Sequence, residues 1–266
     1  MNWTRRHFLG AGAATLAAPA LASASATFDI DYLESRVEAG VLHESQHFIP
    51  PSQVHEAYSH VIYANTSFYG EARQKMWVLR RAGAAWDVAL RDDDYRDREA
   101  AEAAYSWPMS SGALHQGNPR AGPTPSGIFN IDERSERYRG GWGSPGMYKA
   151  MYIDLHYNSG RRSGVAMHGT TSGRYRYFGR PASNGCLRVS QRNMDALHGL
   201  FHPGGARRED SPLWGEVPRY FTSDVADTMD ARRGYVRDGT LLYDDDGVLR
   251  TKMGYTGLLI FFRDDF

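Results

Sequence analysis

The chain has 266 residues, of which 28 are glycine and one is cysteine. Lysine plus arginine and aspartate plus glutamate are equal at 31 each, so no bulk charge draws the chain to nucleic acid or to an anionic membrane surface. The length allows one sizeable domain with additional segments.

The first 26 residues are predicted to be a cleaved export signal. Arg5 and Arg6 precede a weakly apolar, alanine-rich run, no acidic residue occurs before Asp29, and small-x-small cleavage sites end the stretch. The arginine pair resembles the twin-arginine export signal. After this stretch no apolar run approaches the length of a membrane span. We therefore expect the mature protein in the periplasm, without stable membrane insertion.

Residues 27–74 are predicted to form an N-terminal leader. They contain His43-Glu44-Ser45-Gln46-His47, which matches the HExxH pattern of zinc proteases. That pattern needs a long helix, and Pro50-Pro51 stops a helix within about a turn. We interpret the match as chance and expect no metal site and no cofactor. A short helix over residues 52–58 and a strand over residues 60–64 are expected next.

Residues 75–205 carry most of the strand pattern and are predicted to form the main domain, which the motifs described below make the candidate catalytic domain. Residues 76–80 and 85–90 flank a turn containing Gly83 and predict a β-hairpin. Further strands are expected at residues 104–110, 128–131, 147–157 and 165–168. The charged residues 91–102 mix both signs, which is typical of an exposed helix or loop.

One helix is predicted near the end of this domain, over residues 191–201. Ser190 is a suitable N-cap, and Met194, Leu197 and Phe201 recur at helical spacing, so they are expected in the core.

Residues 206–266 are predicted to be an extension packed on the catalytic domain. Strands are expected at residues 214–222 and 258–262, with a hairpin at residues 243–249 that turns at Asp246-Gly247. No function is assigned to this extension. The whole pattern predicts a mainly β fold with some α (β+α), a twisted β-sheet or sandwich with short flanking helices.

The single cysteine lies in the string Ser-Asn-Gly-Cys-Leu-Arg at residues 183–188, and His168 lies eighteen positions before Cys186. In an exported protein an unpaired cysteine is a free thiol. A buried, inert cysteine is the common alternative. Attack on a carbonyl needs a thiolate, a base and donors for the oxyanion, and a cysteine after a glycine facing a strand-end histidine supplies all three. The pattern indicates a cysteine acyl-transfer enzyme.

These residues also carry a family resemblance. His-Gly-Thr at residues 168–170 and Ser-x-Gly-Cys-x-Arg at residues 183–188 resemble the signature of the L,D-transpeptidase (YkuD-type) catalytic domain. Residues 122–131 resemble the Thr-Pro-x-Gly-x-Phe strand entry of that family, and the resemblance covers roughly residues 75–201. Many members have histidine where this chain has Asn184, which cannot titrate, so a proton-relay role there is in doubt.

The resemblance implies roles for the residues of this site. Cys186 would be the nucleophile and His168 its base, with the imidazole oriented by the Gly169 carbonyl and the thiol pKa lowered by the neighbouring histidine. The N–H groups of Gly185 and Cys186 are the candidate oxyanion donors. Four further residues are candidates for substrate contact or support of the site: Ser183, Asn184, Arg188 and His156. For Arg188 we favour a structural role over a carboxylate clamp, and His156 is a candidate second histidine near His168.

The resemblance also implies the substrate. Cys186 would attack a peptidoglycan stem peptide before its terminal D-Ala, and the amine of a second stem would resolve the thioester into a cross-link. Hydrolysis of the same intermediate would make the enzyme an L,D-carboxypeptidase or endopeptidase. An inactive peptidoglycan-binding module is the alternative outside enzymes. Carbapenem-type inhibitors are expected.

Overall fold

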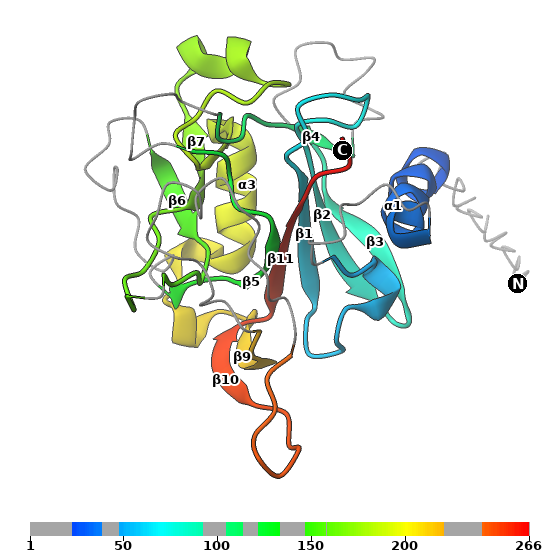
Figure 1. Cartoon of the computed structure of the whole chain (residues 1–266), viewed down its shortest axis with the longest axis vertical. Coiled ribbons are helices and arrows are strands. Elements are labelled where there is room, and N and C mark those ends of the chain that lie inside the picture. Colours follow the sequence, from blue (N-terminus) through cyan, green and yellow to red (C-terminus); the bar gives the residue numbers. More distant parts are fainter. Residues whose placement is uncertain are drawn as a thin grey trace, which may run out of the picture.

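We describe the protein from a computed structural model, over residues 23–38, 48–92, 105–113, 122–133, 147–157, 159–220 and 241–265. The first 22 residues, with the arginine pair, lie outside this range, and so do residues 39–47 with the HExxH string. Helix α1 (Ser23–Glu38) opens the described chain and packs Leu33 into the core of the main sheet (Figure 1).

The main sheet joins strands from both ends of the chain. Its order is β3 (Ala85–Leu90), β2 (Lys75–Ala82), β1 (His60–Asn65), β11 (Gly257–Phe262) and β5 (Gly127–Asn130), and β4 (Trp107–Pro108) pairs with β2. All six residues of β11 are buried, as expected of a strand covered on both faces.

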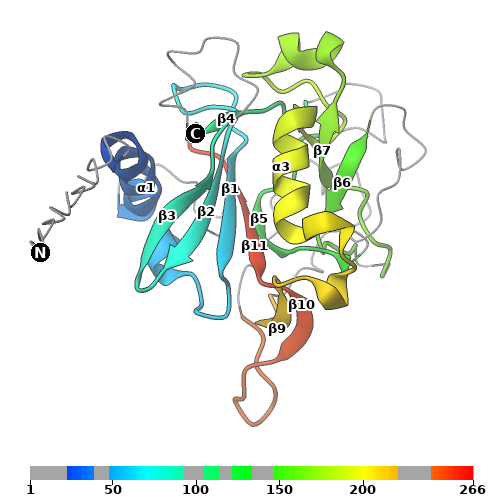
Figure 2. The same ribbon diagram turned by 180° about the vertical axis from the view of Figure 1, so that it is seen from behind.

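A second sheet has three strands, in the order β6 (Tyr148–Tyr152), β7 (Ala166–Thr170) and β8 (Leu187–Ser190). Helix α3 (Gln191–Phe201) lies between this sheet and the main sheet (Figure 2). The Ser190 hydroxyl accepts a hydrogen bond from the Asn193 N–H at 3.1 Å, which caps the helix. Met194, Leu197 and Phe201 are fully buried, so the predicted helix, its cap and its core stripe are confirmed.

Short 3₁₀ turns connect the larger elements. They are η1 (Pro51–Gln53), η3 (Ser172–Tyr177), η4 (Pro203–Gly205) and η5 (Arg208–Asp210). The helix predicted over residues 52–58 was wrong beyond η1. The Arg81 guanidinium donates hydrogen bonds of 2.8–3.1 Å to the carbonyls of Val54, His55 and Tyr58, so these carbonyls bind a distant side chain and not the N–H groups of a helix.

A separate two-stranded hairpin projects below the main sheet (Figure 1): β9 (Trp214–Pro218) and β10 (Thr251–Tyr255). Beyond it, Tyr243 pairs with Leu249 around a turn in which the Gly247 N–H donates to the Asp244 carbonyl at 3.0 Å. The predicted hairpins at residues 76–90 and 243–249 are confirmed. The strand predicted at residues 104–110 is reduced to β4.

The fold class is confirmed as mainly β, with several sheets and few helices. The division of the chain at residues 74 and 205 stays a prediction, but the main sheet runs across both boundaries, because β1 and β11 pair with each other and β1 pairs with β2. Within the described part of the chain, no helix combines the length and the apolarity needed to cross a bilayer.

Candidate active site

Cys186 and His168 come from neighbouring strand segments of the second sheet. β7 and β8 pair in parallel, with Met167 opposite Leu187 and His168 opposite Arg188. Met167 and Leu187 point into the main core. Because side chains alternate along a strand, His168, Arg188 and the residue before β8, Cys186, share the opposite face. Cys186 packs there against a small cluster made of Met147, Ala150, Tyr152 and Ala166.

The imidazole of His168 is held by its own strand. Its Nδ1 lies 2.9 Å from the Gly169 carbonyl oxygen. A carbonyl can only accept, so Nδ1 carries the hydrogen and Nε2 presents its lone pair. Gly169 is tightly enclosed, since a Cβ there would lie 3.0 Å from the Tyr148 ring and 3.1 Å from Gln191 Cα. The imidazole therefore has the tautomer that a general base needs.

Burial sets the charge state of both groups. It lowers the pKa of His168 to about 4, against a smaller upward effect of the bond to Gly169 and with a further lowering by the Arg188 charge. Burial also raises the pKa of the Cys186 thiol, although the Ala166 backbone and Arg188 act in the opposite direction. The prediction from the sequence that the neighbouring histidine lowers the thiol pKa was wrong, because burial raises it. Burial therefore favours the uncharged form of both groups.

The loop that carries Cys186 is fixed by hydroxyl groups. Ser183 Oγ donates to the Cys186 carbonyl and accepts from the Gly185 N–H at 3.1 Å. Gly185 has a φ of 129°, a conformation that side-chain-bearing residues rarely adopt. The Cys186 Sγ lies 3.6 Å from the Gly164 carbonyl oxygen, to which the thiol donates. Ser183 is therefore a positioning group for the nucleophile's loop.

One of the two predicted oxyanion donors is occupied. The Gly185 N–H is used by Ser183 Oγ, so it is not available to a substrate oxygen in this state. Among the described residues, no hydrogen bond of the Cys186 N–H is recorded. The Cys186 N–H remains the candidate donor from this loop.

The other predicted residues, Asn184, Arg188 and His156, differ in their positions relative to Cys186 and His168. Asn184 is exposed beside Cys186. Arg188 Nη1 donates to the Ala182 carbonyl at 3.0 Å, which fits the structural role favoured from the sequence. His156 is not brought beside His168. Ile153 N–H donates to the Val165 carbonyl in the antiparallel pair, so the two histidines lie at opposite ends of it, and His156 faces Asp154 at 3.5 Å.

Sequence reasoning missed the residues that hold the cysteine loop from the outside. The Gly112 N–H donates to Thr124 Oγ1 at 2.8 Å, and the same hydroxyl donates to the Gly185 carbonyl at 2.8 Å. A Cβ on Gly112 would lie 2.3 Å from the Gly122 carbonyl oxygen and 2.8 Å from Gly185 Cα. Thr124 stands in the Thr-Pro-x-Gly string noted above, so a signal was present, but its contact partner is distant in sequence.

No group of three histidine, cysteine, aspartate or glutamate side chains in the described ranges is arranged to hold a metal ion. The arrangement that the described residues do form, a thiol and an oriented neutral imidazole on one sheet face, suits acyl transfer.

Comparison with known families agrees with this chemistry. Residues 93–208 match the YkuD family, the L,D-transpeptidase catalytic domain. The matched stretch contains Thr124, His168 and Cys186 and supports an enzyme of this family. It leaves out β1, the β9–β10 hairpin and β11, which belong to parts of this chain outside the family match. A search of curated proteins finds no match.

Solved structures show a distant likeness. An L,D-transpeptidase from Mycobacterium tuberculosis H37Rv is 16% identical with a TM-score of 0.34, and the match covers 53% of each chain. One from Xylanimonas cellulosilytica DSM 15894 is 21% identical with a TM-score of 0.31, again over 53% of each chain. An L,D-transpeptidase in complex with imipenem is 17% identical with a TM-score of 0.31, over 53% of this chain and 54% of that one. The chain thus spans about half the length of these structures, and at such scores the likeness supports no further conclusion.

Proposed function

We propose that the protein is a peptidoglycan L,D-transpeptidase that forms stem-peptide cross-links through a thioester on Cys186. The observation that carries the proposal is the placement of Cys186 and His168 on one face of the β7–β8 pair, with His168 Nδ1 bound to the Gly169 carbonyl. The family match over residues 93–208 supports the substrate class.

The chemical steps follow from the charge states. The Cys186 sulfur attacks the carbonyl carbon before the terminal D-Ala of a donor stem while the thiol proton moves to His168 Nε2. Collapse of the tetrahedral oxyanion breaks the C–N bond, and His168 returns the proton to the departing amine. An acceptor amine then attacks the thioester, loses a proton to His168 and releases the thiol. In this scheme the thiol proton moves to His168 as the carbon–sulfur bond forms.

The second candidate is hydrolysis of the same thioester, which makes the enzyme an L,D-carboxypeptidase or endopeptidase. Asn184, next to Cys186, is exposed, so this loop borders the solvent that supplies the water for hydrolysis. An inactive peptidoglycan-binding module is the least supported function, because the thiol and its base are both present and share one face.

We also infer export to the periplasm by the twin-arginine route, because Arg5-Arg6 and the alanine-rich run after it lack acidic residues. Peptidoglycan stems are found outside the cytoplasmic membrane, so this location fits the proposed substrate. Fractionation of cells that express the full chain, with an Arg5→Lys, Arg6→Lys variant as control, tests the route. Unchanged export of the variant would contradict it.

The experiment for the reaction is mass analysis of disaccharide-tetrapeptide incubated with the protein or with Cys186→Ala. A dimer lacking one D-Ala, formed only with Cys186 present, is the expected product. Tripeptide monomer alone would assign the carboxypeptidase. A dimer made by the alanine variant would exclude the thioester mechanism. A mass shift on Cys186 after incubation with imipenem tests the expected carbapenem sensitivity.

A further inference from the structure

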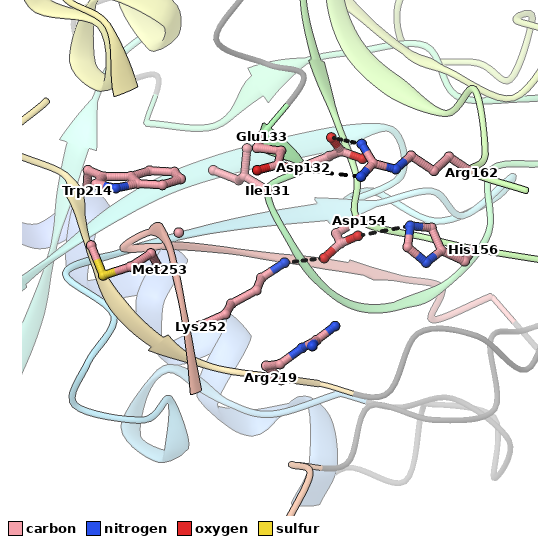
Figure 3. A pocket seen from close by; sticks show the side chains of 11 residues that line it. Ile131, Asp132, Glu133, Asp154, His156, Arg162, Trp214, Arg219, Lys252 and Met253 are labelled. Carbon is pink, nitrogen blue, oxygen red and sulfur yellow. Dashed lines mark hydrogen bonds and ion pairs between the residues drawn. The ribbon is translucent and has the colours of Figure 1, made fainter. Parts of the chain in front are cut away.

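A cavity of about 310 Å³ lies between the β9–β10 hairpin and the segments that follow β5 and β6 (Figure 3). This size is at the lower end for ligand pockets and suits a group no larger than a dipeptide. In the figure, Lys252 and Arg219 enter the cavity from the hairpin side, opposite Asp132 and Arg162.

Part of the wall of the cavity lies on the sheet face that carries Cys186. Met151, Ile153 and Leu155 point into the main core. The alternate side chains, Asp154 and His156, therefore point to the other face, where Cys186 packs against Tyr152 and Ala166. A peptide bound at Cys186 would have to extend along this face to enter the cavity.

The charges of the cavity are paired except at one position. Arg162 lies 3.5 Å from both Asp132 and Glu133, and Glu133 also bonds Arg208 at 3.0 Å. Lys252 binds Asp154. Arg219 lines the cavity from an exposed position, and among the described residues its guanidinium has no carboxylate partner. The paired network leaves Arg219 as the surplus cation.

The other end of the cavity is apolar. Trp214 lines it together with Ile131 and Met253, whose exposed fraction is 58%. The Trp214 ring is held in place by an edge-on contact with Tyr255, with ring centroids 5.0 Å apart. A ligand that fits both ends carries one negative charge and a small apolar group beside it.

We propose that this cavity binds a free carboxylate of the peptide substrate, with the carboxylate on Arg219 and its neighbouring small side chain against Trp214. A guanidinium holds a carboxylate through two parallel hydrogen bonds, which a paired lysine cannot copy. The proposal rests on the proposed function for the identity of the peptide. Arg219, Lys252 and Trp214 lie outside the residues that match the family, so the subsite belongs to the C-terminal extension of this chain.

The test measures binding without turnover. The full chain carrying Cys186→Ala is titrated with N-acetyl-D-alanyl-D-alanine and with its C-terminal amide, by calorimetry. The free acid is expected to bind at least about tenfold more tightly than the amide, because only the acid satisfies Arg219. In Arg219→Gln this preference is expected to disappear, whereas Arg219→Lys keeps part of it. Arg250→Gln, an exposed arginine of the same extension that does not line the cavity, is the matched control.

Three outcomes would overturn the proposal. One is equal binding of acid and amide, and another is a preference that survives Arg219→Gln. The third is a preference lost in Arg188→Gln but kept in Arg219→Gln, which would place the carboxylate at the catalytic loop. Melting temperatures of all variants confirm that each is folded. Because the probe is bound and not converted, these results are independent of whether the tetrapeptide reaction proceeds.

Discussion

The Cys186 site and the hairpin cavity share one face of the β6–β7–β8 sheet but treat charge in opposite ways. At the first, burial keeps the thiol and the imidazole neutral. At the second, three carboxylates lie within 3.5 Å of a cation. A thiol and an imidazole can pass a proton between them during a reaction, whereas a fixed array of charges orients a charged ligand but moves no proton. The difference separates the site suited to chemistry from the site suited to recognition.

The largest expected effect is on kcat, and it distinguishes the Cys186 site from the hairpin cavity. His168→Gln removes the lone pair that accepts the thiol proton, and we expect kcat on tetrapeptide to fall by about 10²- to 10⁴-fold. Lys252→Gln removes a charge from the cavity and is expected to change KM with kcat nearly constant. Steady-state kinetics of both variants check this. A loss of kcat in Lys252→Gln equal to that in His168→Gln would remove the distinction.

The support of the cysteine loop can be broken by a single methyl group. In Gly112→Ala the added Cβ would lie 2.3 Å from the Gly122 carbonyl oxygen. We expect the free energy of unfolding to fall by about 1–3 kcal/mol and labelling of Cys186 by imipenem to be lost. Gly173→Ala is the control, because nothing lies within 4 Å of its Cβ position. Denaturant unfolding checks both, and equal stability of the two variants would contradict the close packing.

A smaller effect is expected where only hydrogen bonds are removed. Thr124→Val keeps the shape of the side chain but leaves the Gly112 N–H and the Gly185 carbonyl without their shared hydroxyl. We expect kcat to fall by about tenfold as the loop loosens, with Thr124→Ser restoring most of it. If Thr124→Ser is as slow as Thr124→Val, the hydroxyl alone does not position the loop.

The pH dependence of kcat/KM tests whether the pKa of His168 is lowered. Because the pKa of His168 is lowered to about 4, its imidazole stays neutral, and able to accept a proton, at every pH above that value. The acid limb of kcat/KM is therefore expected near pH 4. A limb between pH 6 and 7 would indicate an ordinary histidine. Rates of Cys186 acylation by imipenem across pH 3.5–8 measure this, and Lys252→Gln should show the same limb.

The smallest effect concerns stability. Burial lowers the pKa of His198 to about 4 as well, and its ring stacks on His202 with centroids 4.6 Å apart. A histidine whose folded pKa lies below its unfolded value contributes fully above about pH 6.5 and loses that contribution as the pH falls toward 4. The melting temperature is expected to fall between pH 7 and pH 5, and less so in His198→Gln. An identical fall in the variant would rule out His198 as a source.

The sequence by itself determined the local elements and singled out the residues that we propose to react. The helix at residues 191–201, its Ser190 cap and the hairpin at residues 76–90 follow from periodicity, capping and turn chemistry, which act over a few residues. The motifs around Cys186 and His168 could be recognised in the sequence because their residue types and spacing are specific. The Gly169 carbonyl was predicted as the partner of the imidazole, and the structure has that contact.

Only the tertiary structure decided which residues that are distant in sequence contact each other. The parallel pairing of β1 with β11 joins segments almost two hundred residues apart, a distance across which periodicity gives no register. The same is true of Arg81, whose bonds replaced the predicted helix at residues 52–58, and of Thr124, whose hydroxyl bridges two loops. The pKa values of Cys186 and His168 were decided there too, because desolvation depends on what surrounds a group and not on its neighbours in the chain.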